Sequence, residues 1–147
     1  MASNTINRIY HSTAILLPDG RVLSTGAGAQ TGSVDQLNAE IYSPPYLFQG
    51  SRPSITSVPA QLSYGAPFPV ATSSDSSIDK VTLLRLGSVT HSFDQNQRFV
   101  KLTFEAQTDG LSVTAPASGN IAPPGDYLLF VVNHQGVPST GRFVRLR

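Results

Sequence analysis

The stretch that decides the fold class is residues 12–25, STAILLPDGRVLST. In it, two runs of β-branched and other apolar residues flank the turn sequence Pro-Asp-Gly at 18–20. Proline presets the backbone φ angle for a turn and glycine tolerates positive φ, so this stretch predicts an antiparallel hairpin. The glycine-rich residues 26–28 follow, where two backbones can approach closely. A third strand is predicted over 39–42, and two prolines end it.

The remainder of the chain has the same character. Short β-rich runs recur between Gly, Pro and Asn or Asp signals, and apolar residues never show helical spacing over a long window. Strands are predicted at 55–58, 67–72, 81–86, 99–105, 111–115, 127–133 and 141–146. This succession of short strands is typical of an immunoglobulin-like β-sandwich. Tyr127 follows Pro-Gly-Asp, so it is interpreted either as a corner tyrosine or as one more half-buried aromatic residue.

Composition changes in residues 44–54, a proline-rich and partly aromatic connector. We predict a domain boundary there, with three strands in residues 1–48 and the sandwich in residues 49–147. The alternative is a long surface loop within one domain. Three strands alone are marginal in water, and the hairpin followed by glycines suggests part of a propeller blade. Such a blade is expected to pack on the sandwich, to self-associate or to expose apolar surface.

The composition excludes several classes of function. The 147 residues carry ten Lys and Arg against nine Asp and Glu, so the net charge of +1 gives no field to attract nucleic acid. The chain has no cysteine, which excludes disulfides, thiolate metal sites and cysteine nucleophiles. The apolar run at 127–132 is far shorter than the ~20 residues that span a bilayer, so no membrane segment is predicted. The first residues lack a signal-peptide pattern, and we interpret them as a start joined to an internal piece of a longer protein.

Metal chemistry in this chain depends on histidine, tyrosine and carboxylates. The histidines are His11, after Tyr10; His91, in a polar link; and His134, in a turn sequence. Two imidazoles from distant segments and a phenol suit a tetragonal copper(II) site, but a single histidine is more often an ordinary surface or core residue, and spacing alone does not show that the three meet. Strand alternation would also send Tyr10 and His11 to opposite faces unless the backbone there is irregular.

Hydrolytic chemistry has less support. His91 and Asp94 lie near many serines, but the Gly-x-Ser-x-Gly nucleophile motif is absent from the sequence. The acidic residues lie mostly in predicted turns, so they do not indicate the paired carboxylates of a glycosidase.

Four stretches carry a resemblance to a known family. They are RIYHSTAILLPDGRV (8–22), AEIYSPPYL (39–47), SVTHSFDQNQR (88–98) and PGDYLLFVVN (124–133), the second followed by Arg52-Pro53 and the last by GVPS (136–139). In this order they resemble the C-terminal region of galactose oxidases and glyoxal oxidases, which are copper-radical oxidases. The resemblance implies an all-β fold, namely an early-set immunoglobulin-like β-sandwich preceded by an incomplete kelch propeller blade.

The resemblance also implies a site. Tyr10 and His11 correspond to an axial tyrosine and an equatorial histidine of one copper ion, and His91 corresponds to the second histidine, on a hairpin that reaches into the propeller. His134 matches no ligand and is expected in a loop. Members of the family are secreted and oxidise primary alcohols or aldehydes with O2 to give H2O2. The partners implied are the rest of the propeller and a sugar or small alcohol or aldehyde substrate.

One departure from the family limits this interpretation. The family's radical cofactor is a tyrosine cross-linked to a cysteine, and this chain has no cysteine. We therefore expect the chain alone to be inactive. Three interpretations stay open: a fragment of a copper-radical oxidase, a sandwich that binds carbohydrate or a protein partner, and a structural domain that caps a propeller with metal-free histidines.

Overall fold

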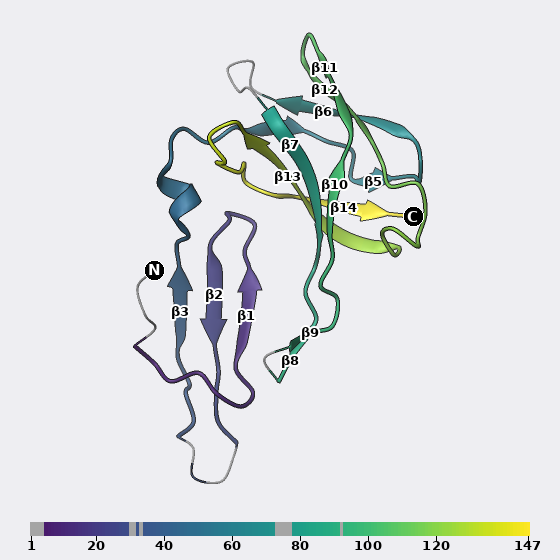
Figure 1. Cartoon of the computed structure of the whole chain (residues 1–147). Coiled ribbons are helices and arrows are strands. Elements are labelled where there is room, and N and C mark those ends of the chain that lie inside the picture. Colours follow the sequence, from purple (N-terminus) through teal and green to yellow (C-terminus); the bar gives the residue numbers. More distant parts are fainter. Residues whose placement is uncertain (1–4, 30–31, 33, 73–77, 92) are drawn as a thin grey trace.

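The computed structural model describes residues 5–29, 32, 34–72, 78–91 and 93–147, and it is built from strands (Figure 1). The first sheet contains β1 (Thr13–Leu16), β2 (Val22–Thr25) and β3 (Ala39–Tyr42), antiparallel and in that order. Leu16 pairs with Val22 across the turn, where Gly20 has a φ of +83°. The predicted hairpin and third strand are therefore confirmed.

The connector forms a short 3-10 helix, η1 (Pro45–Phe48), that the sequence did not predict. The hydroxyl of Tyr46 donates to the carbonyl of Gly20, and burial raises the pKa of this phenol. Farther along, the Arg52 guanidinium donates to the carbonyls of Pro138 (2.9 Å) and Ser139 (2.8 Å). The connector thus holds the β1–β2 turn at one end and the loop at 138–139 at the other.

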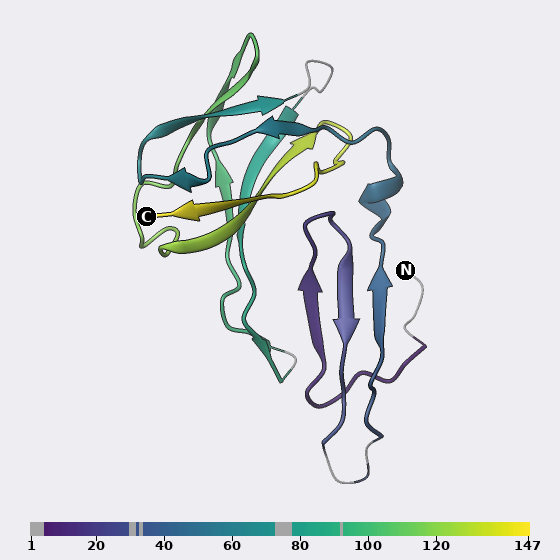
Figure 2. The same ribbon diagram turned by 180° about the vertical axis from the view of Figure 1, so that it is seen from behind.

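The remaining strands form two facing sheets and one small hairpin, as the view from behind shows (Figure 2). The five-stranded sheet has the order β10 (Phe99–Leu102), β7 (Ile78–Arg85), β13 (Gly125–Asn133), β14 (Arg142–Leu146) and β5 (Gln61–Leu62). The four-stranded sheet has the order β11 (Phe104–Gln107), β12 (Gly110–Thr114), β6 (Pro67–Thr72) and β4 (Ile55–Ser57). The hairpin pairs β8 (Val89–Thr90) with β9 (Phe93–Asp94). The predicted sandwich is confirmed.

The core lies between the two sheets. Leu83 and Leu129 pair across β7 and β13 and are fully buried, as are Val70 and Val113 of the opposite sheet. Central strand β13 is buried on both faces, which explains its continuous apolar sequence. Its outer face is turned toward the first sheet. Side chains of the first sheet and of the sandwich, among them Leu16 and Phe130, line an apolar cavity of about 250 Å³.

The prediction of one continuous strand over residues 99–105 was wrong. The structure divides it at Thr103: β10 pairs with β7 in one sheet, and β11 pairs with β12 in the other. A chain that turns a sandwich corner in this way changes sheets while its side chains keep alternating, so the apolar pattern hides the break. Strand β5 was also missed, because its two residues are too short to give a pattern.

Tyr127 is a corner tyrosine. It is fully buried, and its hydroxyl donates to the carbonyl of Pro123, four residues upstream, over 2.6 Å. Burial raises the pKa of the Tyr127 phenol above its ordinary value of about 10. The neutral phenol therefore stabilises the fold below pH ~10, and this contribution is lost as the pH rises through the native pKa.

We expect Tyr127→Phe to lower the free energy of unfolding by about 1 kcal/mol at neutral pH, because the Pro123 carbonyl loses its donor. Above pH ~10 the difference should narrow, since only the wild-type chain has this phenol to ionise. Urea denaturation of both chains across this pH range measures the effect. Equal stability at neutral pH, or a parallel loss in both chains above pH ~10, would contradict the assignment.

Candidate metal centre

Tyr10 and His11 lie in a turn just before β1. His11 has a φ of +62°, and the amide of Ser12 donates to the carbonyl of Ile9 over 3.0 Å. This left-handed residue breaks the strand alternation, so the two rings lie on the same side with centroids 4.0 Å apart. The irregular backbone removes the geometric objection raised by the sequence.

The glycine cluster after β2 supports this turn. The amide of Gly28 donates to the carbonyl of Tyr10 over 2.9 Å. At Gly26, whose φ is +73°, an added Cβ would lie 3.0 Å from the carbonyl oxygen of His11. The expected close approach of two backbones is therefore present, and it positions the Tyr10–His11 turn.

Arg8 supports the turn from the other side. Its guanidinium donates to the carbonyl of Gly26 (2.9 Å) and to the Oδ1 of Asn38 (2.7 Å), and it forms an ion pair with Glu40 (3.0 Å). The Arg8 side chain is only 7% exposed, so these charged contacts are well shielded from water. Sequence reasoning did not single out Arg8, although it begins the first motif of the resemblance.

His91 lies at the tip of the β8–β9 hairpin, which extends from the sandwich alongside β1 (Figure 1). Thr90 pairs with Phe93, so His91 directly follows the last paired residue of β8, and its φ is +52°. Positive φ directly after the first strand is the feature of the turns that tight hairpins favour. The Oδ1 of Asp94 accepts from the amides of Ser88 (2.9 Å) and Asn96 (3.0 Å), which closes the base of the hairpin.

The structure brings the three side chains of the predicted set together. The Nε2 atoms of His11 and His91, 80 positions apart in sequence, are 3.0 Å apart. The ring centroids are 4.5 Å apart for the two histidines and 5.2 Å apart for Tyr10 and His91. Tyr10 is 43% exposed, and both histidines are exposed, so the cluster is open on one side.

The two imidazole nitrogens are spaced as ligands of one metal ion would be. Nitrogen ligands at about 2.0–2.1 Å from a metal and at right angles to each other are separated by about 2.9 Å. The observed 3.0 Å between the two Nε2 atoms matches that edge of a coordination square, the arrangement that copper(II) prefers. Within the described ranges no group of three or more His, Asp or Glu side chains is arranged to hold a metal, so a phenol is needed to complete a set of three.

His134 is not part of the cluster. It lies in the turn after β13, where its Nδ1 is 3.8 Å from the Oδ1 of Asp79 and its side chain is 63% exposed. Lys80 also pairs with Asp79, at 3.0 Å, and its hydrogen bond is the main cause that holds the pKa of this carboxyl below its usual value. His134 therefore serves as a matched control for the other two histidines.

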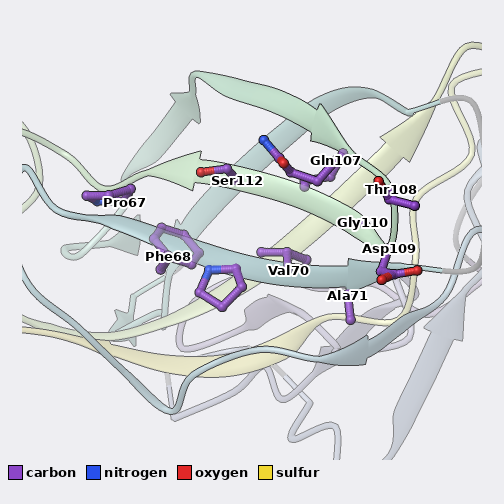
Figure 3. A pocket seen from close by; sticks show the side chains of 11 residues that line it. Pro67, Phe68, Val70, Ala71, Gln107, Thr108, Asp109, Gly110 and Ser112 are labelled. Carbon is purple, nitrogen blue, oxygen red and sulfur yellow. The ribbon is translucent and has the colours of Figure 1, made fainter.

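Two other hollows lie outside the cluster. A shallow pocket of about 480 Å³ lies over β6 and the β11–β12 hairpin, at the far end of the molecule from the β8–β9 hairpin (Figures 1 and 3). Its lining includes Pro67, Pro69 and Asp109 and has no histidine. A groove of about 850 Å³ runs between β1 and the five-stranded sheet, and its lining includes Ile15, Phe143 and Asp94.

Comparison with known proteins places this architecture in a family. Residues 52–146 match the model of the galactose oxidase-like early set domain. The chain belongs to this family. The resemblance stated from the sequence and the early-set immunoglobulin-like fold are thereby confirmed. The predicted boundary between residues 48 and 49 stays a prediction.

Individual relatives extend the similarity to nearly the whole chain. The chain is 37% identical over 151 residues to a galactose oxidase of Gibberella zeae, covering 97% of the chain and 22% of that protein. It is 39% identical over 164 residues to the aldehyde oxidase GLOX of Vitis pseudoreticulata, covering 99% of the chain and 31% of that protein. The chain thus spans less than a third of either relative.

A solved structure shows the same arrangement of strands. A fungal alcohol oxidase of the AA5 family, in complex with copper, superimposes with a TM-score of 0.88 at 30% sequence identity. The match covers 99% of this chain and 32% of that one. The three-stranded sheet and the sandwich are therefore both shared with that oxidase.

Proposed function

We propose that this chain is the C-terminal part of a secreted copper-radical oxidase of the galactose oxidase type. In this proposal Tyr10, His11 and His91 are the copper ligands that this part supplies. The observation that carries it is the 3.0 Å separation of the two Nε2 atoms, one from each part of the chain, with the Tyr10 ring beside them.

Each residue has a defined role in the proposed site. His11 and His91 present Nε2 atoms to the same point, and the phenol of Tyr10 is the third donor. Bound copper would supply a one-electron acceptor for the oxidation of a primary alcohol or aldehyde. The chain's own contribution is to hold the ligands in place. The Arg8 contacts and the glycine cluster fix the turn that carries Tyr10 and His11, and the Asp94 contacts fix the hairpin that carries His91.

The proposed site is incomplete in this chain. The chain has no cysteine and so cannot form a cysteine–tyrosine cofactor, and the ligand cluster is open on one side. We propose that the rest of a kelch propeller covers this side in the parent protein and forms the pocket for a sugar or a small alcohol or aldehyde. We also propose that residues 1–48 are a partial blade and residues 49–147 the sandwich.

Exposed apolar residues on the first sheet and in the loop before β3 support self-association of the isolated chain. Leu37 is 97% exposed and Ile41 on β3 is 50% exposed.

In the described part of the chain no helix is long and apolar enough to cross a membrane.

A structural role is the second candidate. The 2.7 Å hydrogen bond from the Gly141 amide to the Pro18 carbonyl ties the sandwich to the β1–β2 turn of the first sheet. A domain that only caps a propeller needs such contacts but needs no metal. Copper binding therefore separates the two candidates.

Calorimetric titration of the metal-free chain with Cu²⁺ tests the proposal. We expect one copper ion per chain, and His134→Asn should bind the same amount. The copper-loaded chain should form no H2O2 from galactose, a small primary alcohol or glyoxal, because it has no second redox group. Absence of stoichiometric binding would leave the structural role, and sustained peroxide formation would contradict the expected inactivity.

A further inference from the structure

The residue before His91 contacts the ring nitrogen that faces away from the cluster. The Oγ1 of Thr90, on β8, lies 2.7 Å from the Nδ1 of His91. The opposite ring nitrogen of His91, Nε2, is the atom 3.0 Å from His11. One imidazole is therefore held at both nitrogens by different partners.

We propose that Thr90 is a positioning residue that fixes the tautomer of His91. Its hydroxyl oxygen accepts a hydrogen bond from Nδ1–H, which leaves the lone pair of Nε2 directed at the cluster. A neutral imidazole binds a metal only through the nitrogen that carries no proton, and the partner of the other nitrogen decides which one that is. The metal-binding consequence rests on the proposed function; the tautomer itself does not.

The hydrogen bonds of the cluster are all satisfied in this assignment. With His91 protonated at Nδ1, its Nε2 accepts a hydrogen bond from the Nε2–H of His11 across 3.0 Å. The opposite arrangement has the Thr90 hydroxyl donating to Nδ1 and His91 donating from Nε2. That arrangement places the proton between the rings on the Nε2 of His91 instead of the Nε2 of His11, so the two arrangements differ in which ring must change tautomer before it binds a metal.

Nitrogen NMR of histidine-labelled, metal-free protein tests the tautomer directly. At about pH 8 the wild-type chain should show His91 protonated at Nδ1. Thr90→Ser keeps the hydroxyl and should show the same tautomer. Thr90→Val keeps the branched shape, removes the acceptor and should shift His91 toward the Nε2–H form. A wild-type chain with His91 protonated at Nε2, or a valine variant with unchanged His91 signals, would overturn the proposal.

Zinc titration tests the consequence, with Zn²⁺ as a diamagnetic probe. Thr90→Val should bind Zn²⁺ about 10- to 100-fold more weakly than wild type, the usual cost of losing a hydrogen bond to a metal-bound imidazole. Thr90→Ser should restore wild-type affinity, and thermal unfolding of the three metal-free chains should coincide. Equal affinity of the valine variant would overturn the positioning role. A wild-type chain that binds no metal would instead contradict the proposed function, and the tautomer measurement would still decide the role of Thr90.

Discussion

His91→Asn is expected to lower the affinity of the chain for Cu²⁺ by about 100-fold or more. This loss is larger than the usual loss of metal affinity when a residue that only hydrogen-bonds to a ligand is removed. The variant removes one of two imidazoles whose Nε2 atoms are 3.0 Å apart. Asparagine is chosen because it tolerates positive φ, and His91 has a φ of +52° at the hairpin tip. The hairpin should therefore keep its shape while the donor atom is lost, and competition with a chelator of known copper affinity measures the change.

His134→Asn is the matched control for this experiment. It removes an exposed imidazole that lies outside the cluster and contacts Asp79. Its copper affinity should equal that of the wild-type chain. If both asparagine variants weakened copper binding equally, the bound copper would not be held at the Tyr10–His11–His91 cluster.

Leu129→Ala is expected to lower the free energy of unfolding by about 2–5 kcal/mol, the range for emptying a fully buried leucine site. Leu129 has no exposed surface and pairs with Leu83 at the centre of the five-stranded sheet. Because domains of this kind have a total stability of only about 5–15 kcal/mol, the loss is a large part of the whole. Urea denaturation of the metal-free chain measures it.

Phe143→Ala is the control for the core prediction. Phe143 lies on neighbouring β14 but is 61% exposed, so its removal should change stability by no more than about 0.5 kcal/mol. If Phe143→Ala cost as much as Leu129→Ala, the Phe143 side chain would be buried in solution, for example by self-association.

Local chemistry made much of the fold predictable. Pro-Asp-Gly at 18–20 gave the first hairpin, and the apolar run at 127–132 is central strand β13, buried on both faces. The division at Thr103 was not predictable, because changing sheets at a corner leaves side-chain alternation intact. The two-residue strand β5 had too little sequence to show a pattern.

The candidate site was only partly predictable. The sequence supplied Tyr10, His11 and His91 as residue types, and the family resemblance assigned them as a set. Their meeting depends on positive φ at both histidines and on a hairpin crossing from the sandwich to the first sheet, and neither has a periodic signal. Arg8 and Thr90 act through hydrogen bonds to other residues, so residue type alone did not identify them.

Electron paramagnetic resonance of the chain with one equivalent of Cu²⁺ is the decisive measurement for the proposed site. We expect a tetragonal copper(II) signal with coupling to two imidazole nitrogens, present in wild type and His134→Asn and lost in the double variant His11→Asn/His91→Asn. A wild-type signal like that of aqueous copper, or a nitrogen-coupled signal that survives in the double variant, would contradict the assignment of Tyr10, His11 and His91 as a copper site.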